Sequence, residues 1–214
     1  NLHYPAVAGY DLATGLGSFN GANLLAALSA APSTGGGVIG GNFRAGLNFF
    51  SLPYDYSGVS LNALFGYNGV QLAAWRPDLL QYVLTPTAPT DAVHIGQGYW
   101  ARFPRAVTVT TAGAAADPHA NFPLNLPLGW NAIGDPFPAA VSVSGLQFVA
   151  DGRTLAFADA VSAGWVSGTL YRYDASQNSG AGGYVATGAG DALAPGQGCW
   201  LHAARPLTLV IPPP

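Results

Sequence analysis

The chain has 214 residues, of which 50% are hydrophobic and only 8% are charged. Seven Arg and ten Asp give a formal net charge of −3, and the sequence has no cluster of basic residues to neutralise phosphates. Nucleic acid is therefore excluded as an expected partner. Gly, Pro, Asn and Asp interrupt every apolar run before it reaches membrane-spanning length, so no membrane span is expected either.

The composition indicates a chain that folds, because disorder requires low hydrophobicity and high net charge. Abundant Gly and Pro, together with many Val, Thr and aromatic residues, favour short strands joined by tight turns. The sequence thus predicts an all-β fold. The single cysteine, Cys199, excludes an internal disulfide and is expected to be a small buried hydrophobe.

The scarcity of charges has two further implications. Apolar patches are expected to remain on the surface, which is typical of proteins that self-associate. The few carboxylates leave few groups whose protonation would destabilise the fold in acid. We therefore expect a secreted, extracellular protein.

In chain order, a turn-rich stretch comes first and leads into an apolar helix pattern over residues 22–31. Residues 32–43 include a Gly-, Ser- and Thr-rich stretch and are predicted to be a flexible linker. The remainder has the pattern of strands and turns. It is divided into two β-repeats, at 44–113 and 127–214, with a link at 114–126.

The two repeats share an opening and a closing motif. Each opens with a Gly, an apolar residue, an Asn and two apolar residues, at 46–50 and 129–133. Each closes with Gly-Gln-Gly, one further residue and Trp, at 96–100 and 196–200. The glycines permit a turn with positive φ, and the two residues that follow enter a strand with one side chain on each face.

The repeats predict two homologous antiparallel β-sandwiches or barrels of about five to seven strands each. Alternating strands are expected after the closing motifs, at 106–110 and 206–210. Further strands are expected in between, at 72–75, 79–84 and 169–173, and a surface loop at 178–183. Trp100, Trp130 and Trp200 belong to the repeated framework and are interpreted as core residues.

The N-terminal segment carries a dense motif. Residues 8–18 read Ala-Gly-Tyr-Asp-Leu-Ala-Thr-Gly-Leu-Gly-Ser, and Asn20, Gly21 and a helix pattern follow. This segment, over residues 4–28, resembles the end of the catalytic domain in sedolisin-type serine-carboxyl peptidases, the kumamolisin group. The resemblance implies that residues 1–31 are the terminal segment of such a domain and that this chain extends a secreted peptidase.

The resemblance also implies a calcium ligand. Asp11 stands where the family has a carboxylate that binds structural calcium together with nearby backbone carbonyls and a second Asp upstream. Calcium takes six to eight oxygens, and the upstream Asp is not in this chain. We therefore expect no cofactor here, and calcium only in the intact parent protein.

The family's catalytic residues are missing from this chain. Its triad needs a Glu, which the chain lacks, and Leu170 stands where its nucleophile would follow Ser167-Gly168-Thr169. No nucleophile-elbow motif and no metal-ligand spacing of histidines is present either. We therefore expect no enzyme. A hydrolase would require a deep pocket in which Ser, His and Asp converge.

Aromatic residues outside the repeated motifs are the candidate binding residues. Aromatic rings on a sheet face can stack on sugar rings, whereas the alternative is that they fill the cores. The candidate face comprises Tyr54, Tyr56, Trp75, Tyr82, Trp165, Tyr171 and Tyr173.

Two functions follow from these observations. In the first, the chain is a non-catalytic attachment module that binds a polysaccharide, a substrate or a cell-surface component. In the second, copies of the chain assemble into an extracellular filament or matrix.

Overall fold

The computed structural model describes residues 41–214. These residues belong to one compact unit, Val38–Pro214, so both expected repeats lie in a single unit. The peptidase-like segment, Asp11 and most of the expected linker lie outside the described residues. The last three residues of the expected linker form strand β1 (Gly41–Phe43), which corrects that boundary.

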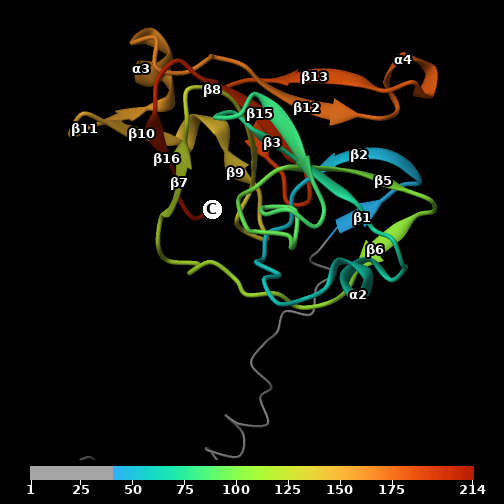
Figure 1. Ribbon diagram of the computed structural model, residues 1–214. Coiled ribbons are helices and arrows are strands. Elements are labelled where there is room, and N and C mark those ends of the chain that lie inside the picture. Colours follow the sequence, from blue (N-terminus) through green and yellow to red (C-terminus); the bar gives the residue numbers. More distant parts are fainter. Residues whose placement is uncertain (1–40) are drawn as a thin grey trace, which may run out of the picture. The chain divides into compact units, whose positions relative to one another are not determined.

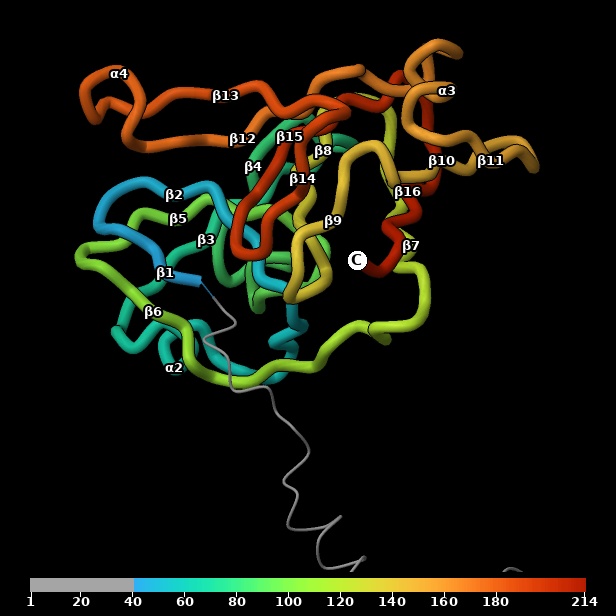
Figure 2. The backbone as a smooth tube through the Cα atoms, turned by 180° about the vertical axis from the view of Figure 1, so that it is seen from behind, coloured from blue at the N-terminus to red at the C-terminus, as the bar shows by residue number. Residues whose placement is uncertain are grey.

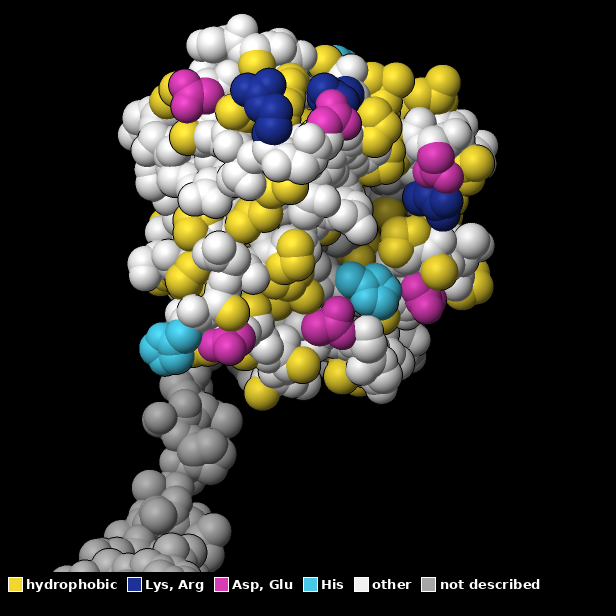
Figure 3. All heavy atoms as spheres, turned by 90° about the vertical axis from the view of Figure 1, so that its left-hand side faces the viewer, with side chains coloured by type: hydrophobic (Ala, Val, Ile, Leu, Met, Phe, Trp, Pro, Cys, Tyr) yellow, Lys and Arg dark blue, Asp and Glu magenta, His cyan; other side chains and the backbone are white. Residues whose placement is uncertain are grey.

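The expected all-β fold is confirmed, since antiparallel sheets dominate and the described helices are short (Figure 1). None of the helices within residues 41–214 is long and apolar enough to cross a membrane. On the face shown in Figure 3, Arg and Asp side chains are scattered, and hydrophobic side chains reach the surface between them.

The first half contains a four-stranded antiparallel sheet, here called the first sheet, with the strand order β2-β5-β3-β4. Its strands are β2 (Gly46–Phe50), β3 (Leu72–Arg76), β4 (Gln81–Leu84) and β5 (Tyr99–Phe103). Strand β1 pairs separately with β6 (Val107–Val109). One face of the first sheet packs with this pair and helix α2 (Leu61–Phe65) around a core that includes Phe50, Leu72, Tyr99 and Phe103.

Helix α2 is defined by its two ends. The Ser60 hydroxyl accepts the N–H of Ala63 as the N-cap, and Gly66 ends the helix with a φ of 71° in the left-handed region. Ser and Gly are preferred at these positions because they satisfy end groups and tolerate positive φ. The apolar side chains of the helix, Leu61, Leu64 and Phe65, are buried in the first core.

The second half contains a sheet of the same kind, here called the second sheet, with the order β13-β12-β15-β8. Its strands are β8 (Gly129–Gly134), β12 (Leu170–Asp174), β13 (Gly183–Thr187) and β15 (Gly198–Ala203). A third sheet has the order β11-β10-β16-β7 and comprises β7 (Phe122–Leu126), β10 (Gln147–Ala150), β11 (Arg153–Ala156) and β16 (Leu207–Ile211).

Smaller elements complete the second half. They are β9 (Val141–Ser142), which pairs with β14 (Ala192–Leu193), the 3-10 helix η1 (Val143–Gly145), and helices α3 (Phe157–Ser162) and α4 (Gln177–Gly180). The second core lies between the second and third sheets and includes Ile133, Phe148, Leu170 and Leu209. Two expected boundaries change: the link at 114–126 ends in strand β7, and the loop at 178–183 contains the end of α4 and the start of β13.

The strand pairings of the first half recur in the second half. Gly46 pairs with Phe103 and Gly129 with Ala203 at corresponding ends of β2–β5 and β8–β15. The same correspondence holds for β3 with β12, β4 with β13, β1 with β7 and β6 with β16.

Side-chain hydrogen bonds repeat as well. The Asn48 amide donates to the carbonyls of Arg44 and Gly46. The Asn131 amide donates to the carbonyls at the same spacing, those of Pro127 and Gly129.

The second sheet stacks on the first, with β12 and β13 above β2 and β5 in Figure 1, and the reverse view in Figure 2 shows the same arrangement. The closing motifs make this close approach possible. Gly96 and Gly196 adopt positive φ, as expected, whereas Gly98 and Gly198 do not. A β-carbon on Gly98 would lie 3.2 Å from Ala132, and one on Gly198 would lie 3.1 Å from the Phe49 ring.

Candidate ligand-binding site

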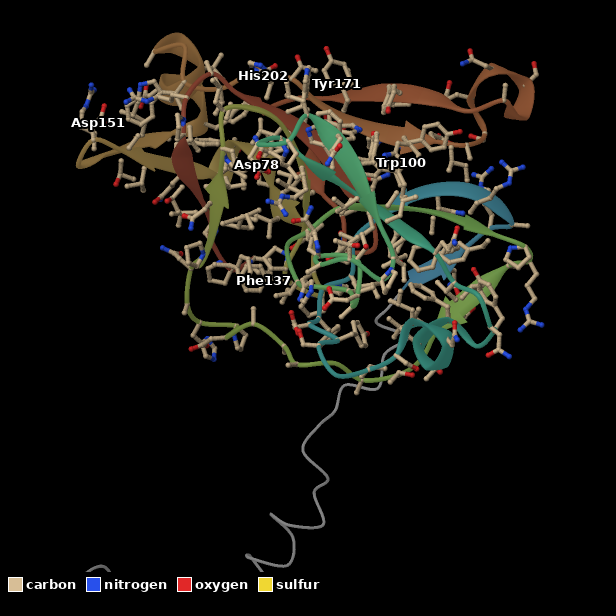
Figure 4. The ribbon with its side chains drawn as sticks, viewed as in Figure 1. Asp78, Trp100, Phe137, Asp151, Tyr171 and His202 are labelled. Atoms are coloured by element: carbon tan, nitrogen blue, oxygen red, sulfur yellow. The ribbon has the colours of Figure 1, made fainter. Side chains whose placement is uncertain are left out.

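A layer of aromatic rings separates the two sheets. Phe49 lies between Trp100 and Trp200, with centroid distances of 4.7 and 5.1 Å and interplanar angles of 20° and 21°. This cluster is separate from both cores. The expectation that Trp100 and Trp200 anchor the cores of their own halves is therefore wrong, because both point away from those cores into the shared layer. Figure 4 shows Trp100 between the two sheets.

A cavity of about 470 Å³ opens beside this layer and is lined by six aromatic side chains. We call it the aromatic cavity; its lining residues are Trp75, Tyr82, Trp130, Tyr171, Tyr184 and Trp200. Two come from adjacent strands of the first sheet, β3 and β4. The other four come one from each strand of the second sheet and run diagonally across it, according to the strand register.

Edge-to-face packing holds the rings of the aromatic cavity. Trp75 meets Tyr82 at 5.2 Å and 65°, and it meets Trp200 at 6.4 Å and 78°. Trp130 meets Tyr171 at 5.9 Å and 63°. Such geometry is favourable because the positive edge of one ring faces the negative face of another. The side chains remain accessible, since Tyr82, Trp130 and Tyr184 are 46%, 42% and 57% exposed.

The polar atoms of the aromatic cavity are neutral groups. The buried Trp75 Nε1 has no hydrogen-bond partner among residues 41–214. Burial raises the pKa of Tyr82, and the nearby Tyr184 raises it further. The phenol therefore stays protonated at neutral pH. No charged side chain of the described residues lines the aromatic cavity, so the site is suited to an uncharged ligand.

The structure brings three of the predicted binding residues together: Trp75, Tyr82 and Tyr171 all line the aromatic cavity. Tyr173 belongs to the adjoining aromatic layer, 5.0 Å from Trp100. Tyr54 packs against the first core instead.

Two predicted residues are wrong, because Tyr56 and Trp165 are 1% and 6% exposed. Tyr56 donates its hydroxyl to the Thr111 carbonyl, and Trp165 lies in the second core, with the Arg153 and Arg205 guanidiniums 5.8 and 5.2 Å from its ring centroid. Both side chains are held inside the fold and cannot contribute to a binding face.

Three of the six residues that line the aromatic cavity are not among the binding residues predicted from the sequence. Trp130 and Trp200 were assigned to the core, and Tyr184 was not included in the candidate face. Alternation within β8 places Trp130 on the face opposite Ile133, which lies in the second core. Alternation shows that Trp130 and Ile133 lie on opposite faces of β8, but it does not show which face packs on the core.

Ser57, His94 and Asp55 converge outside the aromatic cavity. His94 Nδ1 lies 3.2 Å from Ser57 Oγ and 3.4 Å from Asp55 Oδ2. Asp55 Oδ1 also accepts the N–H of Ser57, and its Oδ2 that of Ile95, so this carboxylate ties two loops together. None of these three residues lines the aromatic cavity, whereas a hydrolase is expected to bring such residues together in a deep pocket.

Metal-binding chemistry finds no support in the described part of the chain. No group of three or more His, Cys, Asp or Glu residues is placed there to hold an ion.

Cys199 is buried and free, as expected, and burial raises the pKa of its thiol to about 12.

Comparison of the chain with models of known families, with curated proteins and with solved structures gave no match.

Proposed function

We propose that this chain is a non-catalytic attachment module of a secreted, sedolisin-like peptidase, and that its aromatic cavity binds sugar rings of a polysaccharide. The observation that carries the proposal is the lining of the cavity: six aromatic side chains and no charged one among the described residues. The peptidase part of the proposal rests on the motif at residues 8–18.

The ligand chemistry follows from the lining. Sugar rings present an apolar face of C–H groups that packs on an aromatic ring, and their hydroxyls accept hydrogen bonds. The phenols of Tyr82 and Tyr184, which are 46% and 57% exposed, can donate to or accept from those hydroxyls. Tyr and Trp combine a large apolar area with a polar tip, which suits a ligand of mixed polarity.

The dimensions suit a chain-like ligand. The lining residues of the second sheet cross all four of its strands. With adjacent strands about 4.8 Å apart, this path is at least about 14 Å long. A site of this length can contact several consecutive rings of a polymer.

Titration calorimetry tests the proposal, with the purified chain and a panel of neutral oligosaccharides, together with depletion of the chain by insoluble polysaccharides. We expect a member of the panel to bind, and Trp130→Ala or Tyr184→Ala to weaken binding by about tenfold or more. Tyr54→Ala is the matched control, because that ring lies outside the aromatic cavity. Absence of binding to every neutral glycan, or equal loss in the control, would overturn the proposal.

Self-assembly is the second candidate, and strand β4 favours it. β4 is an edge of the first sheet and pairs only with β3. Leu79, Leu80 and Leu84, in and beside this strand, are 50%, 77% and 55% exposed. No charge or Pro lies within β4 to discourage pairing with another strand.

The backbone of β4 is oriented for such pairing. The Thr85 N–H donates to the Leu72 carbonyl, so alternation along the strand directs the backbone groups of Tyr82 and Leu84 outward. Light scattering over a range of concentrations tests this candidate. Assembly predicts oligomers that Leu84→Lys dissociates, and a monomer at every concentration contradicts it.

A further inference from the structure

We propose a second carbohydrate site in the first half of the chain, at the position structurally equivalent to the aromatic cavity, which binds an acidic sugar. The proposal deepens the proposed function and rests on it for the class of ligand. It concerns a different cavity, different residues and a ligand of different charge.

The strand registers establish the equivalence. Trp130, Tyr171 and Trp200 of the second sheet correspond to Leu47, Ala73 and Trp100 of the first. The three corresponding residues line a cavity of about 570 Å³ on the first half, here called the Arg102 cavity. Three equivalent strand positions thus line a cavity in each half, with different side chains.

Unlike the aromatic cavity, the Arg102 cavity has a charged side chain and amide side chains in its lining. Leu47, Leu84 and Trp100 give it an apolar wall, whereas Arg102, Gln71 and Asn68 supply a guanidinium and two amides. Arg102 corresponds to His202, which packs against Trp130 near the aromatic cavity. Figure 4 shows His202 beside Tyr171.

Arg102 carries the charge specificity. Its side chain is exposed, and it forms no ion pair with any residue in the described range 41–214. A guanidinium presents a planar fork of donors that matches the two oxygens of a carboxylate. An acidic sugar would place its carboxylate on Arg102, its ring face on Trp100 and Leu47, and its hydroxyls on Gln71 and Asn68.

The occupant is assigned to the same glycan class because the two cavities adjoin. The ring centroid of Trp100, which lines the Arg102 cavity, lies 6.4 Å from that of Tyr184, which lines the aromatic cavity. One polysaccharide chain with neutral and acidic residues can therefore contact both. Two weak sites on a single ligand also raise the overall affinity.

The experiment uses the full chain and a panel of uronic acid oligosaccharides, with calorimetry at two salt concentrations. Trp130→Ala serves as the background, because it removes a ring from the aromatic cavity only. We expect acidic oligosaccharides to bind this variant, and Arg102→Ala to weaken that binding by about 10- to 100-fold, the range for hydrogen bonds to a charged group. Arg153→Ala is the control, since it removes the same charge on strand β11.

Several outcomes would overturn the proposal: no uronic acid oligosaccharide binds, Arg102→Ala and Arg153→Ala weaken binding equally, or an acidic peptide competes as well as the glycan. Failure of the proposed function gives a different pattern. In that case neutral oligosaccharides do not bind the wild-type chain, whereas the acidic panel still distinguishes Arg102→Ala from Arg153→Ala.

Discussion

Ser51 and Gly134 occupy the same position in their respective halves and pack directly against each other, so that a β-carbon added to Gly134 would overlap the Ser51 side chain. The Ser51 hydroxyl meanwhile donates to the carbonyl of Gln197 in the other half, at 2.9 Å. Residues related by the repeat therefore meet at the contact between the halves. The aromatic layer and the aromatic cavity both depend on this close approach.

Replacing Gly134 by Ala should destabilise the chain by about 1 to 3 kcal/mol, the usual cost of inserting atoms into a packed site. Chemical denaturation measures the change in the free energy of unfolding. Gly190→Ala is the control, because a β-carbon there would meet nothing within 4 Å. The double variant Ser51→Gly with Gly134→Ala should recover part of the loss, since it exchanges the two residues. No recovery would contradict direct packing between them.

Removal of the unpartnered indole donor should separate binding from stability. Trp75→Phe keeps an aromatic ring in the aromatic cavity but removes Nε1. We expect the free energy of unfolding to rise by up to about 1 kcal/mol, because the lost donor is buried without a partner among residues 41–214, and glycan affinity to change by less than about 3-fold, because the buried Nε1 does not reach a ligand. Calorimetry and denaturation give the two values. A larger loss of affinity would show instead that the ligand reaches Trp75 Nε1.

The two repeated asparagines should differ in their contribution to stability. Both donate two hydrogen bonds to carbonyls just before them, but Asn131 is 5% exposed and Asn48 is more accessible. Asn131→Ala should cost about 2 to 3 kcal/mol, because it leaves two carbonyls without a partner in a buried site, and Asn48→Ala about 1 kcal/mol. Equal losses in denaturation experiments would show that burial does not set the difference.

Stability should decrease as the pH rises from about 4 to about 7. Asp135 is fully buried and accepts the N–H groups of Phe137 and Val141 at 2.8 and 3.3 Å. Burial raises its pKa to about 7 against an ordinary value of 3.8. Between these values the folded state holds a proton that the unfolded state has released, so raising the pH favours unfolding by up to about 4 kcal/mol.

The variant Asp135→Asn tests this assignment, because it cannot ionise and should flatten the pH dependence in that window. The carboxylates of Asp55, Asp78 and Asp174 have lowered pKa values and act in the opposite sense. Their contribution is complete above an ordinary pKa of about 4 and disappears below it. An unchanged slope between pH 4 and 7 in the variant would assign the effect to other groups.

The elements that sequence predicted well depend on local patterns. The aromatic segments at 72–75 and 169–173 are predicted to be strands, and β3 and β12 lie within one residue of those bounds. The turn at Gly96 and Gly196 was expected from the need for positive φ, and both residues adopt it. Helices α2 and α3 were missed, since five or six residues give too little periodicity to recognise.

The sequence by itself determined the all-β class and the places of several strands and turns, because these depend on residues close together in the chain. Only the tertiary structure decided which rings form the aromatic cavity. In β3, Leu72 and Ala74 face the first core, whereas Trp75 faces the second sheet, so both faces are apolar. Alternation cannot distinguish a core face from an interface when both are apolar, and that choice follows only from the packing of one half against the other.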